Sequence, residues 1–175
     1  NGAVILQAQP KKSGDPANRV ITEKNAAMTD SLMRGVVRNG TARAAMALGR
    51  SDIAGKTGTT NDAVDAWFNG YQPKLVGIAW MGFDKPKSLG ESEFGGTLAL
   101  PIWMNYMRVA LKDQPIAANE PPAGMVKVYV DGSGRMSTSG GGLAEYVKVE
   151  DLDRMRDNLD FLGSDQPDEE AFDIF

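Results

Sequence analysis

The chain has 175 residues, of which 42% are hydrophobic and 24% are charged, a composition typical of a globular protein. It contains no cysteine and no histidine, which excludes disulfides, thiolate metal sites and the usual general base. We therefore expect no metal and no cofactor, and acyl-transfer chemistry would have to use lysine, hydroxyl or carboxylate groups. The net charge of −4 is unevenly placed, because residues 150–175 carry ten acidic residues against two arginines. The rest of the chain has no clustered basic face, which argues against a nucleic-acid binder.

The N-terminal part of the chain predicts one strand and one helix. Residues Ala3–Gln9 have strand character and are followed by Pro10 and a polar turn segment, residues 11–16. Thr22 is a suitable helix N-cap and Gly40 a suitable terminator, and the apolar residues between them have helical spacing. We expect these apolar residues to form one buried stripe: Met28, Leu32, Met33, Val36 and Val37.

The middle of the chain predicts an antiparallel sheet closed by a helix. The segment Asp52–Thr60 is too rich in threonine and glycine for a helix and is expected to be extended. Two further strands, Ala66–Tyr71 and Leu75–Met81, are separated by a short turn, which favours an antiparallel meander. Helical spacing returns over Leu98–Leu111, with Pro101 tolerable in the first turn. The expected fold class is α+β, an antiparallel sheet covered by helices.

We expect the chain to divide into three parts. Residues 1–116 form the domain body, and residues 117–125, in a stretch rich in proline and alanine, form a linker. Residues 126–175 form a C-terminal extension, in which residues 126–130 and 146–149 are expected to pair as a hairpin. A short amphipathic helix with Leu152, Met155, Leu159 and Leu162 follows, before an acidic tail whose composition indicates solvated disorder rather than a partner site.

The tripeptide Gly55-Lys56-Thr57 matches the end of a phosphate-binding loop, but its surroundings do not. Such a loop has four residues between its glycines, whereas five separate Gly49 from Gly55. The lysine of such a loop also lies at a helix N-terminus, and the residues after Thr57 are a poor start for a helix. The sequence therefore does not indicate a nucleotide site.

A Lys-Thr-Gly run on a strand, here Lys56-Thr57-Gly58, is instead one signature of the serine acyltransferases that react with penicillin. The match extends to Arg38-Asn39-Gly40-Thr41, Asp65-Ala66-Trp67-Phe68, Gly82-Phe83-Asp84, Gly95-Gly96 and Pro101-Ile102-Trp103. In these motifs the chain resembles the closing part of the transpeptidase domain of class A penicillin-binding proteins. The resemblance implies a penicillin-binding-protein/β-lactamase-like transpeptidase fold, with residues 1–116 as the C-terminal portion of that domain.

The resemblance implies a bifunctional cell-wall enzyme. Its transpeptidase part acylates an active-site serine with a peptidoglycan stem peptide ending in D-Ala-D-Ala, passes the acyl group to the amine of another strand, and is blocked by β-lactam antibiotics. The implied location is the periplasmic face of the bacterial cytoplasmic membrane. The glycosyltransferase domain and the membrane anchor would lie in the N-terminal remainder of the same protein. Because this chain has no initiator methionine, signal peptide or membrane-spanning run, we expect it to be a fragment.

The Lys-Thr-Gly strand supplies the candidate site residues. By resemblance, the backbone N–H of Thr59 is an oxyanion donor and Lys56 is a supporting catalyst that keeps the site positive, so both are candidate catalytic residues. The hydroxyls of Thr57 and Thr59 suit a terminal carboxylate. Gly58 lets a peptide lie flat against the strand, and Thr60 completes the candidate substrate-binding set.

The chain contains neither a Ser-x-x-Lys nor a Ser-x-Asn sequence, so the nucleophile is expected outside it. Ser31-Leu32-Met33-Arg34 comes nearest, but an arginine does not serve as the base. Alternatives to the transpeptidase are a related serine β-lactamase, a D,D-carboxypeptidase, and a non-catalytic penicillin-recognising scaffold. A Ser-x-x-Lys sequence upstream of Asn1 would favour an enzyme over the scaffold.

The aromatic residues have structural explanations beside the functional one. Adjacent residues on a strand face opposite sides, so one of Trp67 and Phe68 is expected in the core and the other at the surface or the rim of a cleft. Trp67 is the candidate cleft residue. Trp103, Tyr106 and Met107 have helical spacing and are expected to pack in the core.

Overall fold

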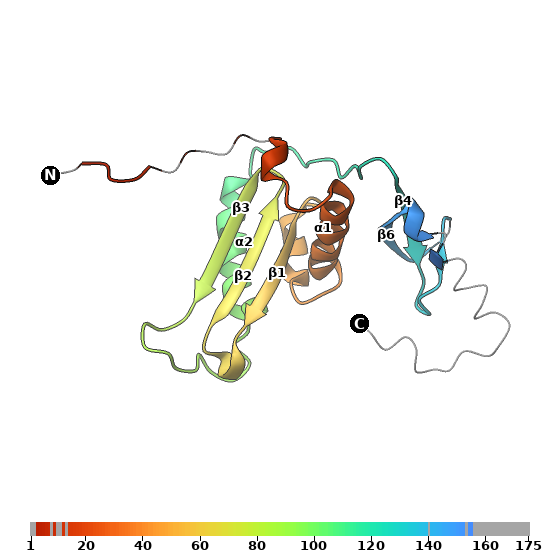
Figure 1. The fold of residues 1–175 in the computed structure, drawn as a ribbon. Helices are drawn as coiled ribbons and strands as arrows, with labels where there is room; N and C mark the ends of the chain where they lie inside the picture. The colour runs from red at the N-terminus through yellow and green to blue at the C-terminus, as the bar shows by residue number, and fades with distance from the viewer. Residues whose placement is uncertain are drawn as a thin grey trace.

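The computed structural model describes residues 3–7, 9, 12, 14–139, 141–152 and 154–155. Its centre is an antiparallel sheet of three strands, β1 (Ala54–Thr59), β2 (Ala66–Gln72) and β3 (Leu75–Met81), in the order β1-β2-β3 (Figure 1). A single 3₁₀ turn, η3 (Asn61–Ala63), joins β1 to β2, and only two residues join β2 to β3. The predicted antiparallel meander is therefore confirmed, because each strand pairs with the next along the chain.

One face of the sheet is covered by α2 (Leu100–Ala110), which continues from a π-helical turn, η4 (Gly95–Ala99). Pro101 lies in the first turn of α2, as predicted. Trp103 packs edge-on against Phe68, with 4.9 Å between the ring centroids, and its Nε1 donates to the carbonyl of Gly77 at 3.1 Å. Helix α2 is thereby fixed to both β2 and β3.

The residues of α2 that face the sheet are Leu100, Trp103, Met104 and Met107, all of which are buried. Trp103 and Met107 were expected in the core, and their burial confirms this. Tyr106 was expected there too, but that prediction is wrong, since its side chain is 58% exposed. Its position is separated from Met107 by 100° of helical rotation, which turns it toward solvent.

Helix α1 (Glu23–Arg38) lies beside β1 and begins and ends as predicted. Thr22 is the N-cap, its Oγ1 accepting a hydrogen bond from Asn25 N at 3.2 Å, and Gly40 follows the end of the helix. The expected apolar stripe is partly wrong. Leu32 is 62% exposed, and the buried positions of the helix are Ser31, Arg34 and Val37.

A polar network explains why α1 buries charged and polar residues. The Nε of Arg34 pairs with Asp30 at 2.5 Å, and its Nη1 donates to the carbonyl of Ser51 at 2.9 Å. The hydroxyl of Tyr71, on β2, donates to the second oxygen of Asp30 at 2.9 Å. Burial and this hydrogen bond raise the pKa of Tyr71 to about 12. The network fastens α1 to the start of β1 and the end of β2, a role that apolar contacts were predicted to fill.

A second buried ion pair joins Arg50 and Asp52 just before β1, with Nη2 and Oδ2 at 2.7 Å and Nε and Oδ1 at 2.9 Å. Arg50 also donates to the carbonyls of Gln114 and Pro115, and Asp52 accepts from the N–H of Ala117 at 2.9 Å. Burial acts to raise the pKa of Asp52, but the hydrogen bonds from Arg50 and Ala117 outweigh it and hold that pKa below its usual value. The pair thus ties the chain that leaves α2 to the start of β1.

A second sheet follows, with the strand order β5-β4-β6, built from β4 (Met125–Val130), β5 (Met136–Ser137) and β6 (Leu143–Lys148). The pairing of β4 with β6 agrees with the predicted hairpin, whereas β5 was not predicted. The second sheet contacts α1 (Figure 1): the hydroxyl of Ser31 donates to Glu145 at 2.5 Å. Lys24 also pairs with Glu150, just after β6, at 2.9 Å. The boundaries 1–116, 117–125 and 126–175 stay predictions.

The N-terminal end of the chain differs from the prediction, and most of the C-terminal end lies outside the described residues. The described residues of the predicted strand, 3–7 and 9, are not in a strand, and a strand needs a neighbouring strand for stability. A 3₁₀ turn, η1 (Pro16–Asn18), follows them. The predicted C-terminal helix is seen at residues 149–152 and 154–155, while Leu159, Leu162 and the rest of the acidic tail lie outside the described residues.

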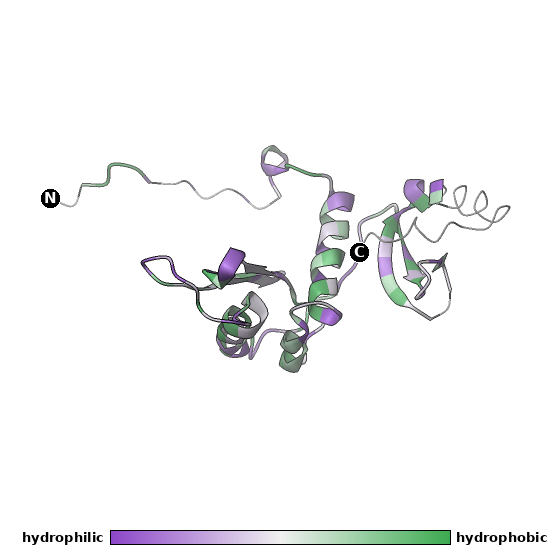
Figure 2. Ribbon diagram, turned by 90° about the horizontal axis from the view of Figure 1, so that it is seen from below, coloured by the Kyte–Doolittle hydropathy of each residue, from purple (hydrophilic) through white to green (hydrophobic). Residues whose placement is uncertain are grey.

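The sheet has one open face. Seen along its strands in Figure 2, the sheet has α2 on one side, and Figure 1 shows the other side of β2 and β3 toward the viewer. Apolar side chains stand on that open side, including Val76 at 70% exposure and Ile78 at 65%. In the described part of the chain, no helix combines the length and apolar character needed to cross a membrane.

We predict that Asp52→Asn lowers the free energy of unfolding at pH 7 by about 3 kcal/mol, because it leaves the guanidinium of Arg50 buried without a charged partner. The pKa of Asp52 is lower in the folded state, so the ion pair stabilises the fold above the ordinary aspartate pKa of about 3.9. This stabilisation is lost as the pH falls through the folded-state pKa. Urea unfolding at several pH values should show the gap between wild type and variant closing below about pH 4.

Asp113→Asn is the matched control, because Asp113 lies close in the chain to Gln114 and is exposed. It should change the free energy of unfolding by less than about 0.5 kcal/mol. A gap between wild type and Asp52→Asn that persists unchanged at acid pH would contradict the role given to the ion pair.

Candidate functional site

Strand β1 presents the backbone of Thr57 and Thr59 at a free edge of the sheet. β1 pairs with β2 on one side, and in the described residues no strand pairs with its other side. The N–H of Thr60 donates to the carbonyl of Asp65 at 3.1 Å, so Thr60 directs its backbone groups toward the β2 side. Because backbone groups of an antiparallel strand alternate between its two edges, those of Thr57 and Thr59 point to the free edge.

The side chains of the Lys-Thr-Gly strand leave it on both faces. Lys56 is exposed, and its Nζ reaches the carbonyl of Thr57 at 2.9 Å. Thr57 is half-buried and Thr59 is exposed, and both project from the face opposite to Lys56, since side chains alternate along a strand. The ammonium, two hydroxyls and free N–H groups therefore border the same strand edge. Such an edge can bind an extended peptide and a carboxylate.

Thr60 is placed differently from the other two threonines. Its hydroxyl accepts a hydrogen bond from the N–H of Asp65 at 2.7 Å and so closes the turn between β1 and β2. Asp65 in turn accepts from the indole Nε1 of Trp80 at 2.8 Å. The structure therefore gives Thr60 a local structural contact, and its substrate-binding role stays a prediction.

Two segments that were predicted as family motifs, but not as part of the site, contact the threonine hydroxyls of β1. Oγ1 of Thr41, in the loop after α1, lies 2.6 Å from Oγ1 of Thr57. The N–H of Gly95, at the start of η4, donates to Oγ1 of Thr59 at 3.0 Å. A usable sequence signal was the pair Gly95-Gly96 just before a predicted helix, because paired glycines often mark a close approach of two backbones.

The approach at Gly95 is close enough to exclude any side chain. A Cβ on Gly95 would lie 2.3 Å from the carbonyl oxygen of Trp67 and 2.5 Å from that of Gly58. A Cβ on Gly96 would lie 2.7 Å from the carbonyl oxygen of Thr41. The start of η4 is therefore pressed against β1 in the middle of the Lys-Thr-Gly segment.

Trp67 lies directly opposite Gly58 on β2 and is 36% exposed, whereas Phe68 is buried under α2. This confirms that the two aromatic side chains face opposite sides of the sheet. Trp67 packs on Trp80, with 5.9 Å between the ring centroids, on the same face as Lys56. The structure thus places Trp67 next to the site strand, and its contact with a ligand stays a prediction.

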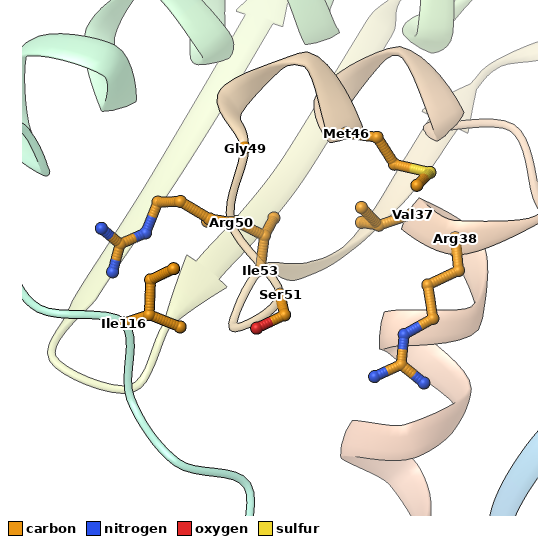
Figure 3. A pocket seen from close by; sticks show the side chains of 8 residues that line it. All are labelled: Val37, Arg38, Met46, Gly49, Arg50, Ser51, Ile53 and Ile116. Carbon is orange, nitrogen blue, oxygen red and sulfur yellow. The ribbon is translucent and has the colours of Figure 1, made fainter.

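The pocket in Figure 3 is separate from these residues. It measures about 480 Å³ and lies between the end of α1, the 3₁₀ helix η2 (Arg43–Leu48) and the chain before β1. Its lining is mostly apolar, and Arg50 at its edge is engaged by Asp52 and by carbonyls after α2. Its lining includes none of the candidate site residues, which lie on β1 at the edge of the sheet.

The described residues contain no group of three or more metal-ligating side chains. The nearest approach to a serine nucleophile motif, Ser31, is buried in α1 with its hydroxyl bonded to Glu145. Ser31 is therefore a structural residue.

Comparison with known proteins shows that the chain is similar to penicillin-binding proteins. Residues 4–107 match the family described as penicillin binding protein transpeptidase domain. Penicillin-binding protein 1A of Pseudomonas aeruginosa is 43% identical over 177 aligned positions, which cover 98% of this chain and 22% of that protein. Penicillin-binding protein 1A of Neisseria lactamica is 52% identical over 125 residues, which cover 71% of this chain and 16% of that protein.

A solved structure agrees with these matches. The crystal structure of penicillin-binding protein 1A from Haemophilus influenzae is similar in fold, with a TM-score of 0.67 and 34% identity. The similarity covers 74% of this chain and 21% of that structure. The chain therefore spans only about a fifth of the length of the relatives that it matches.

We predict that Gly95→Ala destabilises the protein by about 3 kcal/mol, because the added methyl group would overlap the backbone of β1 and β2. Thermal unfolding followed by circular dichroism should show a lower Tm. Gly35→Ala in α1 is the matched control, since a Cβ there meets no atom within 4 Å and alanine favours a helix. Equal Tm values for Gly95→Ala and wild type would show that η4 does not press on β1.

Proposed function

Because the chain belongs to the penicillin binding protein transpeptidase domain family, we propose that it is the C-terminal part of a peptidoglycan D,D-transpeptidase. In this proposal, β1 forms one side of the active site, and a serine outside this chain is the nucleophile. The observation that carries the proposal is the free edge of β1, where Thr57 and Thr59 direct their backbone groups outward beside the Lys56 ammonium.

The proposed reaction has two steps. The serine oxygen bonds to the carbonyl carbon of the penultimate D-Ala of a stem peptide, and the terminal D-Ala leaves after taking up a proton on its nitrogen. An amine of another stem peptide then attacks the ester carbonyl, which forms the cross-link and frees the serine. β-Lactams acylate the same serine, and their opened ring stays attached.

Strand β1 would orient the acyl donor by pairing with it as an added strand. The outward N–H of Thr59 would donate to the developing oxyanion, a contribution that is worth about 10²–10³ in rate in other acyl-transfer enzymes. Gly58 has no side chain, so the peptide could lie close against the strand. The hydroxyls of Thr57 and Thr59 would bind the terminal carboxylate. Lys56 would hold the site positive and assist proton transfer, while Thr60 and Trp67 would line its border.

We propose that the N-terminal remainder of the same protein completes the domain around this chain. Two observations support this: the chain spans about a fifth of its relatives, and β3 ends the described sheet with apolar side chains exposed on the open face. Val76, Ile78 and Trp80 would be covered by that remainder, since a monomeric protein rarely exposes such a patch. The membrane anchor and glycosyltransferase domain would also lie in the remainder, with the transpeptidase on the periplasmic face of the bacterial cytoplasmic membrane.

We predict that Lys56→Ala slows acylation of the longer parent protein by fluorescent penicillin at least about 100-fold, because the variant loses a cation and a proton-transfer aid at the site. The measurement is a labelling time course read on a denaturing gel. Lys74→Ala, in the turn between β2 and β3, removes a lysine from the same sheet away from the site and should label at the wild-type rate. Unchanged labelling of Lys56→Ala would refute the role given to Lys56.

We also predict that the 18.8 kDa chain alone takes up no covalent penicillin, while the parent protein does. The chain lacks a Ser-x-x-Lys sequence, and its closest match is buried in α1. Label on the isolated chain would place a nucleophile within it. Rapid release of label from the parent would instead favour a β-lactamase, and a parent that never labels would favour a scaffold.

A further inference from the structure

The two threonine hydroxyls of β1 are each engaged by a residue outside the strand. Gly95 N–H donates to Oγ1 of Thr59 at 3.0 Å, and Oγ1 of Thr41 lies 2.6 Å from Oγ1 of Thr57. Both contacts come from segments remote in the sequence, one after α1 and one before α2. Thr57 and Thr59 share one face of β1, two residues apart and so about 6.6 Å apart along the strand.

The hydrogen-bonding capacity of a hydroxyl decides what each threonine can offer a ligand. A hydroxyl has one proton to donate and two lone pairs that accept. Since Thr59 accepts from a backbone N–H, which can only donate, its own proton is left for a ligand. The hydroxyl proton of Thr57 is likewise left for a ligand only if Thr41 is the donor in the contact between the two hydroxyls.

The position of Thr41 is set by its surroundings. The N–H of Ala42 donates to the carbonyl of Val36 at 3.1 Å, which closes the chain after α1, and Ala42 is fully buried. The carbonyl of Thr41 lies so close to Gly96 that no side chain fits between them. The loop that carries Thr41 is therefore held between α1 and η4, beside the site strand.

We propose that Thr41 is a positioning residue for the carboxylate site of the transpeptidase. Its hydroxyl donates to Oγ1 of Thr57, so that Thr57 and Thr59 both direct a proton to the terminal carboxylate of the acyl donor. The proposal rests on the function proposed above and adds a residue outside the Lys-Thr-Gly strand. A carboxylate accepts hydrogen bonds and donates none. Two hydroxyls that each accept a hydrogen bond from a protein group keep their own protons to donate to the carboxylate.

The test compares Thr41→Val with Thr41→Ser in the parent protein. Valine keeps the shape of threonine without its hydroxyl, and serine keeps the hydroxyl. The readout is the acylation rate with a penicillin that has a free carboxylate, divided by the rate with the methyl ester of the same penicillin. We expect Thr41→Val to lower this ratio about five- to tenfold, the effect of one hydrogen bond, and Thr41→Ser to restore it.

Two further variants make the result specific. In a Thr57→Val background, adding Thr41→Val should change the ratio no further, since the two residues act through one contact. Thr29→Val is the matched control, because Thr29 lies on α1 and its hydroxyl bonds only to the carbonyl of Asn25 in the described contacts. It should leave the ratio unchanged.

The outcomes separate this inference from the function it rests on. If the wild-type parent is acylated and Thr41→Val keeps the wild-type ratio, Thr41 is not a positioning residue and the proposed function stands. Equal slowing with the acid and the ester would likewise overturn the inference, because it would indicate a general disturbance of the site. If the wild-type parent is never acylated, the proposed function fails and the inference fails with it.

Discussion

The ion pair between Arg50 and Asp52 is the contact on which the position of the site strand depends. It is buried directly before β1, and its remaining hydrogen bonds reach the chain that leaves α2. The same short segment is held from the other side by Arg34, which donates to the carbonyl of Ser51. Charged groups thus fix the start of β1 to α1 on one side and to the segment after α2 on the other.

Much of the fold followed from the sequence, because the relevant signals are local. Threonine, glycine and aromatic residues in short runs predicted the three strands, and Thr22 and Pro101 located the helix starts. The motifs around Lys56 also predicted the family, which the match of residues 4–107 confirms. Leu32 and Tyr106 were misplaced because helical spacing alone does not say which neighbour a face meets. The neighbour of α1 supplies polar groups, so Ser31 and Arg34 are buried instead.

The candidate site was only half predictable for a similar reason. Lys56 and Thr57 belong to a contiguous motif, so their place on a strand could be predicted. The contacts of Thr41 and Gly95 join segments separated by 16 and 36 residues from their partners. Both segments belong to motifs that are recognisable in the sequence, but neither motif indicates which residue of β1 it contacts. What the motif could not indicate was which groups set the direction of its hydroxyl protons.

The contact between the second sheet and α1 has a consequence for the order in which the parts of the protein fold during synthesis. Lys24 and Glu150 are 126 residues apart in the chain, and Ser31 and Glu145 are 114 apart. Closing loops of this length is slow compared with forming a local hairpin or helix. A ribosome releases the sequence from its N-terminal end, so α1 and the central sheet are synthesised well before β6 exists. The side of α1 that carries Lys24 and Ser31 must therefore remain without these partners until β6 has been synthesised, more than a hundred residues after the helix.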